Sequence, residues 1–308
     1  MKHFINLKDI PSTDLRKMIV DAKRRKKLRK KLNTLEVDKG APLRGKLLIQ
    51  MFEKSSLRTR LSFYLAIKQL GGGTLTLRSN ELHLGQGGES IADTAKILST
   101  YGDGFMLRTD SDKKVENFKN HLSIPLINGL SPSSHPTQVL SDVFTVEEIM
   151  KKPISKLNIC WIGDSNNVLD SLIAASVKFS FQLSIGCPKK FEPGKKIRDW
   201  VKKNSREIFI YNDAKKAVKG ADVIFSDKVV SLNDKVNKKK KIEQFKKFKI
   251  DKALMKFSNN AIFLHCLPRG NEVSNEVFLG KKSYVWQQAL NRVHVQKSIL
   301  LYTFGKLR

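Results

Sequence analysis

Cysteine is scarce in this chain, which has three among its 308 residues. Cys160, Cys187 and Cys266 lie far apart, are odd in number and form no Cys-x-x-Cys pair. The sequence therefore argues against a disulfide framework and against a cysteine-based zinc site, and it favours a reducing compartment such as the cytoplasm.

Long apolar runs are also missing. No stretch of about 18 apolar residues occurs, so the sequence predicts no membrane span. The first residues, MKHFINLKDI, lack the basic-then-apolar order of a secretory signal. Because 40% of the residues are hydrophobic, the chain has enough apolar material for one large globular domain or two ordinary ones.

Acidic residues are few relative to basic ones, with 29 Asp and Glu against 58 Lys and Arg and a formal net charge of +29. Such an excess attracts polyanions, including nucleic acids. The lysines are scattered through every segment, however, and the dense runs at 22–32 and 237–249 carry spaced apolar residues, as solvated helix faces do. No RNA- or DNA-binding motif accompanies them, so nucleic-acid binding is the less favoured interpretation.

Short β-rich runs alternate with helical patterns along the chain. The segments that read as buried strands in the first half are 46–52, 73–77, 104–108 and 124–128. A second set of strand-like runs follows at 157–163, 182–187, 208–211, 221–226 and 261–266. The helical patterns of the first half are at 57–70, 90–101 and 135–150, with a short polar stretch at 111–118, and the chain closes with one at 284–304. This alternation predicts an α/β protein with parallel sheets flanked by helices.

The segment KKPISK at 151–156 breaks the pattern and is the best candidate for a linker. We therefore expect two α/β domains, 1–150 and 151–283. The closing helix at 284–308 is expected to return to the first domain.

Hydroxyl and guanidinium groups gather where the first long helix of this sheet begins, in FEKSSLRTRLSF at 52–63. Unpaired backbone N–H groups at a helix start favour an anion. The hydroxyls of Ser56 and Thr59 can donate, and Arg58 can hold a phosphate through two parallel hydrogen bonds. The alternative is an ordinary N-cap at Ser56 with surface arginines beside it.

Further polar groups follow other strands of the same predicted sheet. Arg108 ends one strand, and His135, Thr137 and Gln138 begin the long helix after the next. Open α/β sheets bind ligands at the carboxyl ends of their strands. We therefore expect these side chains to converge on one site for an anion and a carbonyl group.

The second half places a different set of groups at strand ends. Asn166 and Asn167 follow one strand, and Asp227 and Ser231 follow another. Each alone is a common turn former. Together they offer a carboxylate for an ammonium group and amide or hydroxyl donors for a carboxylate, which is what an amino-acid substrate needs. The His265–Cys266 pair ends a third strand, and without further ligand spacing it is weak support for a metal.

Seven segments then match a known family in the family's order between residues 44 and 297. They are FEKSSLRTRLSF, ESIADTAKIL, NGLSPSSHPTQVLSD, GDSNNVLDSL, DKVVSLN, HCLPRGNEVSNEV and NRVHVQK. The chain resembles the aspartate/ornithine carbamoyltransferase superfamily and, within it, the ornithine carbamoyltransferase family. The combination of HCLP with D-x-x-x-S favours ornithine over aspartate as the acceptor.

The resemblance implies transfer of a carbamoyl group from carbamoyl phosphate to L-ornithine, giving L-citrulline and phosphate in arginine metabolism. It implies a carbamoyl phosphate domain followed by an ornithine domain, no metal or organic cofactor, and a homotrimer with shared active sites.

The resemblance also implies roles for individual residues. Those implied to bind carbamoyl phosphate are Ser56, Leu57, Arg58, Thr59, His83, Arg108, His135, Pro136, Thr137, Gln138, Cys266, Leu267 and Arg292. Those implied to bind ornithine are Asn167, Asp227, Ser231 and Leu232. The implied catalytic set is Arg108, His135, Gln138, Asp227 and Cys266.

The chemistry makes its own demands on these residues. Attack on a carbonyl needs stabilisation of the developing oxyanion, which cationic Arg108 and His135 could supply. A side-chain amine with a pKa of about 10.4 must lose a proton before it attacks. Asp227 and Cys266 are both candidates for receiving that proton, and holding the two substrates in a crevice between the domains would supply proximity.

Four departures from the family pattern accompany the matches. Leu57 replaces a threonine, and Leu232 and Asn233 replace Met-Gly. In HLGQGGES, His83 takes the place of a family glutamine that reaches a neighbouring subunit, with Gln86 as a rival. The loop in HCLPRG is also shorter than usual.

Other interpretations stay open. The altered S-L-N loop allows one of them, a carbamoyltransferase acting on putrescine or a modified ornithine, although Asp227 and Ser231 argue against putrescine because a diamine has no carboxylate to anchor. Another is a non-catalytic homologue with a structural role, and a third is the basic nucleic-acid-binding protein.

Overall fold

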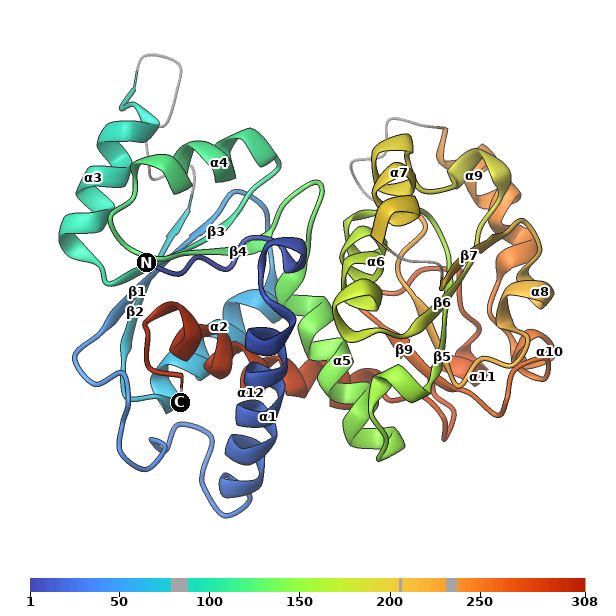
Figure 1. Cartoon of the computed structure of the whole chain (residues 1–308), viewed down its shortest axis with the longest axis horizontal. Helices are drawn as coiled ribbons and strands as arrows, with labels where there is room; N and C mark the ends of the chain where they lie inside the picture. The colour runs from blue at the N-terminus through green and yellow to red at the C-terminus, as the bar shows by residue number, and fades with distance from the viewer. Residues whose placement is uncertain (79–87, 205–206, 231–236, 308) are drawn as a thin grey trace. The chain divides into compact units, whose positions relative to one another are not determined.

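The structure is a computed structural model that describes residues 1–78, 88–204, 207–230 and 237–307. It divides into two compact units, which are Met1–Phe144 with Leu290–Arg308 (unit 1) and Thr145–Ala289 (unit 2) (Figure 1). Helices α5 (Pro136–Met150) and α12 (Val285–Thr303) each have residues in both units. The chain therefore passes between the units through helices rather than through loops.

Unit 1 contains a four-stranded parallel sheet in the order β2-β1-β3-β4. Its strands are β1 (Leu47–Phe52), β2 (Gly73–Arg78), β3 (Gly104–Arg108) and β4 (Leu126–Leu130). The chain reverses its direction across the sheet between β1 and β3, and this switch point is where an open α/β sheet leaves room for a ligand. The register pairs Phe52 with Arg108, so the loop after β1 begins beside the last residue of β3.

The expectation of a buried strand at 73–77 is wrong in one respect. This segment forms β2, but β2 is an edge strand, and its residues are half-buried or exposed. An edge strand has a neighbour on one side only, so its apolar side chains are covered less completely than those of β1 and β3.

The helices of unit 1 flank this sheet. They are the 3-10 turn η1 (Leu7–Asp9), α1 (Ser12–Leu28), α2 (Leu57–Gln69), α3 (Ile91–Tyr101) and α4 (Asp112–His121), together with most of α5 and α12. The polar stretch expected at 111–118 is in fact the start of α4. Ser111 caps it by accepting from Lys114 N at 3.2 Å, and Phe118 packs on Phe105 with ring centroids 5.2 Å apart. Only two apolar residues one turn apart anchor α4, which is why its periodicity was weak in the sequence.

Helix α12 is held in unit 1 by buried charge. Lys297 Nζ donates to both carboxylate oxygens of Asp38, at 3.0 and 2.9 Å, and Arg29 also donates to Asp38. Ser298 Oγ donates to Asp21 at 2.8 Å. A buried ammonium needs such a partner to offset its lost hydration. This packing sets the position of Arg292 farther back along the same helix.

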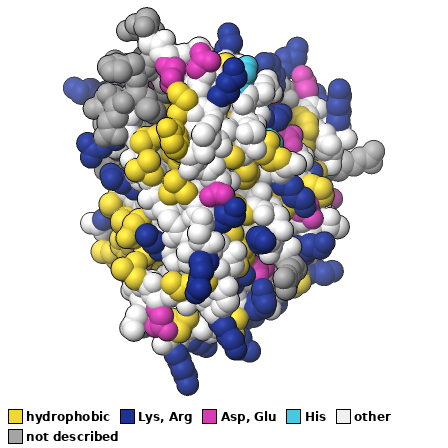
Figure 2. All heavy atoms as spheres, turned by 90° about the vertical axis from the view of Figure 1, so that its left-hand side faces the viewer, with side chains coloured by type: hydrophobic (Ala, Val, Ile, Leu, Met, Phe, Trp, Pro, Cys, Tyr) yellow, Lys and Arg dark blue, Asp and Glu magenta, His cyan; other side chains and the backbone are white. Residues whose placement is uncertain are grey.

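Large apolar side chains are exposed on unit 1, and Figure 2 shows apolar side chains gathered on one face of it. Leu57, Leu61 and Tyr64 recur at helical spacing on α2, so they share one side of that helix. The other exposed apolar residues from neighbouring segments are Leu75 of β2 and Ile97 and Tyr101 of α3.

Unit 2 contains a five-stranded parallel sheet in the order β7-β6-β5-β8-β9. Its strands are β5 (Asn158–Ile162), β6 (Gln182–Gly186), β7 (Ile208–Tyr211), β8 (Val223–Ser226) and β9 (Ile262–His265). Here the switch point lies between β5 and β8. The loops that follow these two strands carry the asparagine pair and Asp227.

The remaining helices belong to unit 2. They are α6 (Asn167–Phe179), α7 (Lys195–Asn204), α8 (Ala214–Val218), α9 (Lys238–Phe245), α10 (Lys252–Met255) and α11 (Asn275–Phe278), with 3-10 turns η3 (Ile154–Lys156), η4 (Lys189–Phe191) and η5 (Lys246–Phe248). The predicted fold class, two helix-flanked parallel sheets with a C-terminal helix, is confirmed. Within the described ranges, no helix combines the length and the apolar content that a membrane crossing requires.

Candidate functional site

The start of α2 carries the hydroxyl and guanidinium groups from which the sequence predicted an anion site. Ser56 is the N-cap, and its Oγ accepts from Thr59 N at 3.3 Å. The capping role that the sequence allowed for Ser56 is therefore present. Because the hydroxyl acts as an acceptor in this bond, its own proton remains available to donate to an anion at the helix start. Leu57 is 71% exposed at the first helical position and contributes its backbone N–H there.

The loop before this helix is held by Glu53, a residue that sequence reasoning did not single out. Its backbone N donates to Arg108 O at 3.0 Å. Its carboxylate accepts from Thr109 Oγ1 and from Lys114 Nζ, the latter at 2.6 Å. These bonds join the ends of β1 and β3 and the start of α4, so they set the distance between the α2 loop and Arg108.

Four predicted residues from separate segments of unit 1 form one hydrogen-bonded cluster. Thr59 Oγ1 receives Arg292 Nη2 at 2.7 Å and Arg108 Nη1 at 3.4 Å. Arg292 Nη1 also donates to Gln138 Oε1 at 2.5 Å. The sequence places these residues up to 233 positions apart, and the fold brings them to the β1–β3 switch point.

Two hydrogen-bond donors in this region have no acceptor within the described part of the protein. Arg108 Nε and Thr137 Oγ1 are buried, and neither has a hydrogen-bond partner among the described residues. A buried donor without an acceptor costs about 1–3 kcal/mol, so such groups are commonly completed by a ligand or water. Their chemistry fits an oxygen-rich anion.

The charges of the cluster differ from the sequence-based expectation at one residue. Burial and the neighbouring Arg58 lower the pKa of Arg108 to about 10, so it stays cationic at neutral pH. Burial, Arg292, Arg108 and Arg58 lower the pKa of His135 well below its ordinary value. The expectation of a cationic His135 is therefore wrong, because three guanidinium groups and the lack of water disfavour a further positive charge. His135 is a neutral imidazole here.

In unit 2, the asparagine pair and Asp227 lie together at the β5–β8 switch point. Asn166 caps α6, and its Oδ1 accepts from Val168 N and Leu169 N at 3.0 and 3.1 Å. Its Nδ2 donates to Asp227 Oδ2 at 3.0 Å. Asn166 therefore orients the carboxylate, while Asn167 stands beside it as the first residue of α6.

The Asp227 carboxyl is a better proton acceptor than an ordinary aspartate. Loss of hydration raises its pKa, and Glu272 adds to that effect, while His265, Lys228 N–H and Asn166 oppose it. A carboxylate in this setting gains more than an exposed one from a cationic ligand, because the ligand replaces missing hydration.

The loop after β9 is anchored by His265 and Glu272. Leu267 N donates to His265 Nδ1 at 2.9 Å, which assigns the proton to Nε2, and Nε2 lies 3.1 Å from Glu272 Oε1. Glu272 also accepts from Gly270 N at 2.5 Å. These contacts hold the loop carrying Cys266, which is buried, and the half-buried Leu267.

Several predicted residues lie outside the described ranges. They are His83 and Ser231 and Leu232, together with the rival Gln86 and the replaced glycine position Asn233. The described residues of the predicted set fall into two groups. Ser56 to Thr59, Arg108, His135 to Gln138 and Arg292 lie in unit 1, and Asn167, Asp227, Cys266 and Leu267 lie in unit 2.

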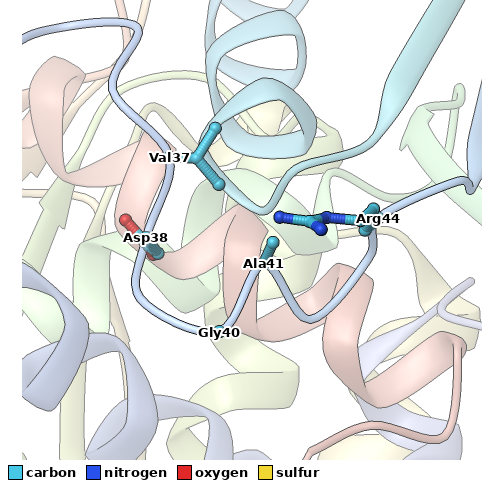
Figure 3. A pocket seen from close by; sticks show the side chains of 5 residues that line it. All are labelled: Val37, Asp38, Gly40, Ala41 and Arg44. Carbon is cyan, nitrogen blue, oxygen red and sulfur yellow. The ribbon is translucent and has the colours of Figure 1, made fainter.

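Two other features do not add to these groups. Within the described part of the chain, no three His, Cys, Asp or Glu side chains are grouped as metal ligands. A cavity of about 450 Å³ in unit 1 is lined by Val37, Asp38, Gly40, Ala41 and Arg44, and Figure 3 shows the Arg44 side chain extending toward Val37 and Ala41. It contains none of the predicted site residues, and Asp38 is already bound by Arg29 and Lys297.

Two family models together match most of the chain. The family model "Aspartate/ornithine carbamoyltransferase, carbamoyl-P binding domain" matches residues 2–148, and "Aspartate/ornithine carbamoyltransferase, Asp/Orn binding domain" matches 155–303. The chain is 41% identical over 307 residues to an ornithine carbamoyltransferase of Agrobacterium fabrum, covering 99% of this chain and 98% of that protein.

Solved structures give the same result. An ornithine carbamoyltransferase from Pyrococcus furiosus matches with a TM-score of 0.91 and 35% identity, covering 99% of this chain and 97% of that one. The anabolic ornithine carbamoyltransferase from Campylobacter jejuni matches with a TM-score of 0.88 and 35% identity, covering 99% and 100%. This chain therefore belongs to the ornithine carbamoyltransferase family of enzymes.

Proposed function

We propose that this enzyme transfers the carbamoyl group of carbamoyl phosphate to the side-chain amine of L-ornithine, giving L-citrulline and phosphate. The observation that carries the proposal is the cluster of Thr59, Arg108, Gln138 and Arg292 at the β1–β3 switch point. Two positive charges, a hydroxyl and an amide at one strand edge suit a ligand that has both phosphate and carbamoyl oxygens.

Unit 1 supplies the groups for carbamoyl phosphate. The phosphate would lie at the start of α2, where Ser56 Oγ and backbone N–H groups can donate and Arg58 adds charge. Arg108 Nε would donate to a ligand oxygen in place of its missing protein partner. Pro136 begins α5, so its ring removes one N–H that would otherwise need an acceptor at the helix start.

The carbamoyl group would be polarised by Arg108 and His135 acting differently. Arg108 provides positive charge for the oxygen on which negative charge develops. His135 is neutral, so it contributes a hydrogen bond rather than a charge. Gln138 would bind the carbamoyl nitrogen through its Oε1, the atom that now accepts from Arg292.

Unit 2 supplies the groups for ornithine. Asp227 would bind the ammonium of the amino acid, and Asn167 would donate to its carboxylate, with Ser231 and Leu232 completing the pocket. Asn166 keeps the Asp227 carboxylate in place during this binding. Cys266 and Leu267 would lie against the reacting side chain, on the loop that His265 and Glu272 hold.

The reaction then balances as follows. The ornithine amine loses a proton to a group of the site, and Asp227 and Cys266 remain the two candidates. The neutral nitrogen attacks the carbamoyl carbon, forming a C–N bond and an oxyanion. The oxyanion collapses, the C–O bond to phosphate breaks, and phosphate leaves with the electron pair. The attacking nitrogen then passes its second proton to the departing phosphate, which gives the ureido group of citrulline and inorganic phosphate.

The test is citrulline formation from carbamoyl phosphate and ornithine, with putrescine as a competing acceptor. We expect citrulline to be the main product even with equal putrescine. Preferential carbamoylation of putrescine would overturn the acceptor assignment. Absence of transfer to either amine would overturn the reaction itself.

We also propose that the enzyme acts as a cytoplasmic homotrimer with active sites shared between subunits, in arginine metabolism. The exposed apolar side chains of α2, β2 and α3 support self-association, because burying them in a partner would remove apolar area from water. Several of them adjoin the start of α2, so an interface there would lie close to the phosphate-binding groups.

A further inference from the structure

A buried ion pair joins α9 to the loop that follows β5. Lys241 Nζ donates to Asp164 Oδ2 at 2.5 Å, and the two side chains are 4% and 16% exposed. Many lysines of this chain are exposed, whereas the Lys241 ammonium is buried. Burial is costly unless a partner offsets it, so the pair has a definite geometry rather than the loose one of a surface contact.

The surroundings of Lys241 are apolar. Its Nζ lies 5.6 Å from the centroid of the Phe191 ring, and that ring lies 4.9 Å from the ring of Phe245. The ammonium therefore lies beside an aromatic ring as well as the Asp164 carboxylate. Water has little access to the pair, which strengthens the attraction between its members.

The partner carboxylate sits on the loop that carries the proposed ornithine-binding groups. Asp164 is two residues before Asn166, whose Nδ2 holds Asp227 at 3.0 Å. The Asp164 carbonyl is fixed in addition by Trp161 Nε1 at 3.2 Å. The ion pair and the amide–carboxylate bond thus act on the same short loop from two directions.

Both α9 and the end of β8 are therefore bonded to the loop between β5 and α6. Asp227, directly after β8, is bonded to the β5–α6 loop through Asn166, and Lys241, in the second turn of α9, is bonded to it through Asp164. We propose that Lys241 is a positioning residue for the amino-acid acceptor, acting through Asp164 to hold Asn166 and Asp227 in their binding arrangement. The inference rests on the proposed function, since it concerns the same ornithine site.

A purely structural ion pair and a positioning one have different kinetic signatures. If the pair only stabilised unit 2, its loss would lower the melting temperature and leave the KM of both substrates unchanged in the folded enzyme. If it positions the acceptor site, its loss raises the KM for ornithine and leaves carbamoyl phosphate binding unchanged, because the carbamoyl phosphate groups of the α2 and β3 region belong to unit 1.

The experiment compares Lys241→Met with Lys240→Met, a matched control that removes the same charge from an exposed site on the same helix. We expect the KM for ornithine to rise by about tenfold in Lys241→Met, since small displacements of positioning groups cost up to about 100-fold. Lys240→Met should match the unmodified enzyme, and Lys241→Arg should restore most of the affinity because it keeps the charge.

A second variant, Asp164→Asn, removes the charge of the partner with little change of shape and covers the case in which Lys241→Met does not fold. The double variant should lose no more ornithine affinity than either single one, because the two residues act as a unit. An unchanged ornithine KM in the folded variants, equal loss for both substrates, or additive losses would each overturn the inference. Failure of the unmodified enzyme to make citrulline would instead overturn the proposed function.

Discussion

At the scale of single residues, Arg108 is the group whose environment most clearly anticipates a ligand. Its side chain is half-buried with a buried Nε, its Nη1 donates to Thr59, and its Nε has no acceptor among the described residues. Its pKa of about 10 keeps it charged under working conditions. The planar guanidinium holds its donors in a fixed geometry that suits a carbonyl oxygen and a phosphate oxygen together, and the ammonium of a lysine does not impose that geometry.

We therefore predict that Arg108→Lys lowers kcat by about 100-fold or more, the usual loss when one donor to a developing oxyanion is removed. The fold should be unaffected, as circular dichroism and the melting temperature can show. Arg44→Lys, at an exposed arginine of unit 1, is the matched control and should keep full activity. Near-normal turnover in Arg108→Lys would exclude the proposed role.

Asp227, the proposed ornithine-binding carboxylate, lowers the stability of the folded protein. Its folded-state pKa is raised, so the folded protein holds this proton to a higher pH than the unfolded chain does. The carboxyl therefore destabilises the fold increasingly as pH rises from the unfolded pKa through the folded one, and the penalty persists at neutral pH.

The variant Asp227→Asn should therefore resist urea better than the unmodified enzyme at pH 7, and the advantage should shrink in acid. Its KM for ornithine should rise by about 30-fold or more, since losing a buried charge partner costs about 2 kcal/mol or more. Titration with carbamoyl phosphate should be unaffected. A variant that is less stable at pH 7, or that binds ornithine normally, would contradict this account.

At the scale of elements, α12 links a buried charge network to the candidate site. Arg292 of this helix donates hydrogen bonds to Thr59 and Gln138. Lys297, in a later turn, donates to Asp38. His294 lies between them and is buried. Its burial and the nearby Lys297, Lys26 and Arg29 lower its pKa to about 3, while Asp38 opposes the shift.

The pH dependence follows with a definite sign. Below pH 6.5 the unfolded chain protonates His294, whereas the folded chain does not until about pH 3, so stability falls as pH falls through this window. Between pH 8 and pH 5 this residue should cost about 2 kcal/mol of unfolding free energy.

The acid limb is the fall in unfolding free energy between pH 8 and pH 5. His294→Gln should flatten this limb by that amount in urea titrations, because glutamine does not bind a proton here. His121→Gln, at an exposed histidine of α4, is the control and should leave the limb unchanged. An acid limb equally steep in His294→Gln would show that His294 is protonated in the folded state.

At the scale of the whole molecule, the exposed apolar residues of unit 1 are the feature that a single chain leaves unexplained. Leu61 is 52% exposed and Leu75 is 49% exposed, on a helix and on an edge strand of the same unit. An edge strand also presents unpaired backbone groups to solvent. A partner subunit would cover both the exposed apolar side chains and the unpaired backbone groups of the edge strand.

We predict that Leu61→Glu shifts the enzyme from a trimer toward a monomer in sedimentation or light scattering, with a loss of activity, because a charge in a closed apolar interface is strongly disfavoured. Leu279→Glu in unit 2, where the native side chain is 68% exposed, is the matched control and should leave the mass unchanged. A monomeric unmodified enzyme with full activity would contradict the proposed assembly.

Much of this protein can be derived from its sequence. The alternation of β-rich and helical segments depends on local propensity and burial, so strands such as 104–108 and helices such as α5 were predictable within about two residues. Motifs such as SSLRTR and HPTQ keep hydroxyl, guanidinium and imidazole groups close together in sequence, so they could be assigned to strand ends. The weakly apolar α4 and the edge position of β2 could not be predicted, because neither leaves a pattern in the local sequence.

Only the tertiary structure decided how distant groups act on one another. The contact of Arg292 with Thr59 joins residues 233 positions apart, and no local pattern encodes it. His135 is neutral because it is buried and because arginines surround it. The pairing of Lys241 with Asp164 depends on where α9 packs. Residue type determines which charges a chain can carry, but only the folded surroundings set their pKa values and their partners, because electrostatic energy depends on distance and on access to water.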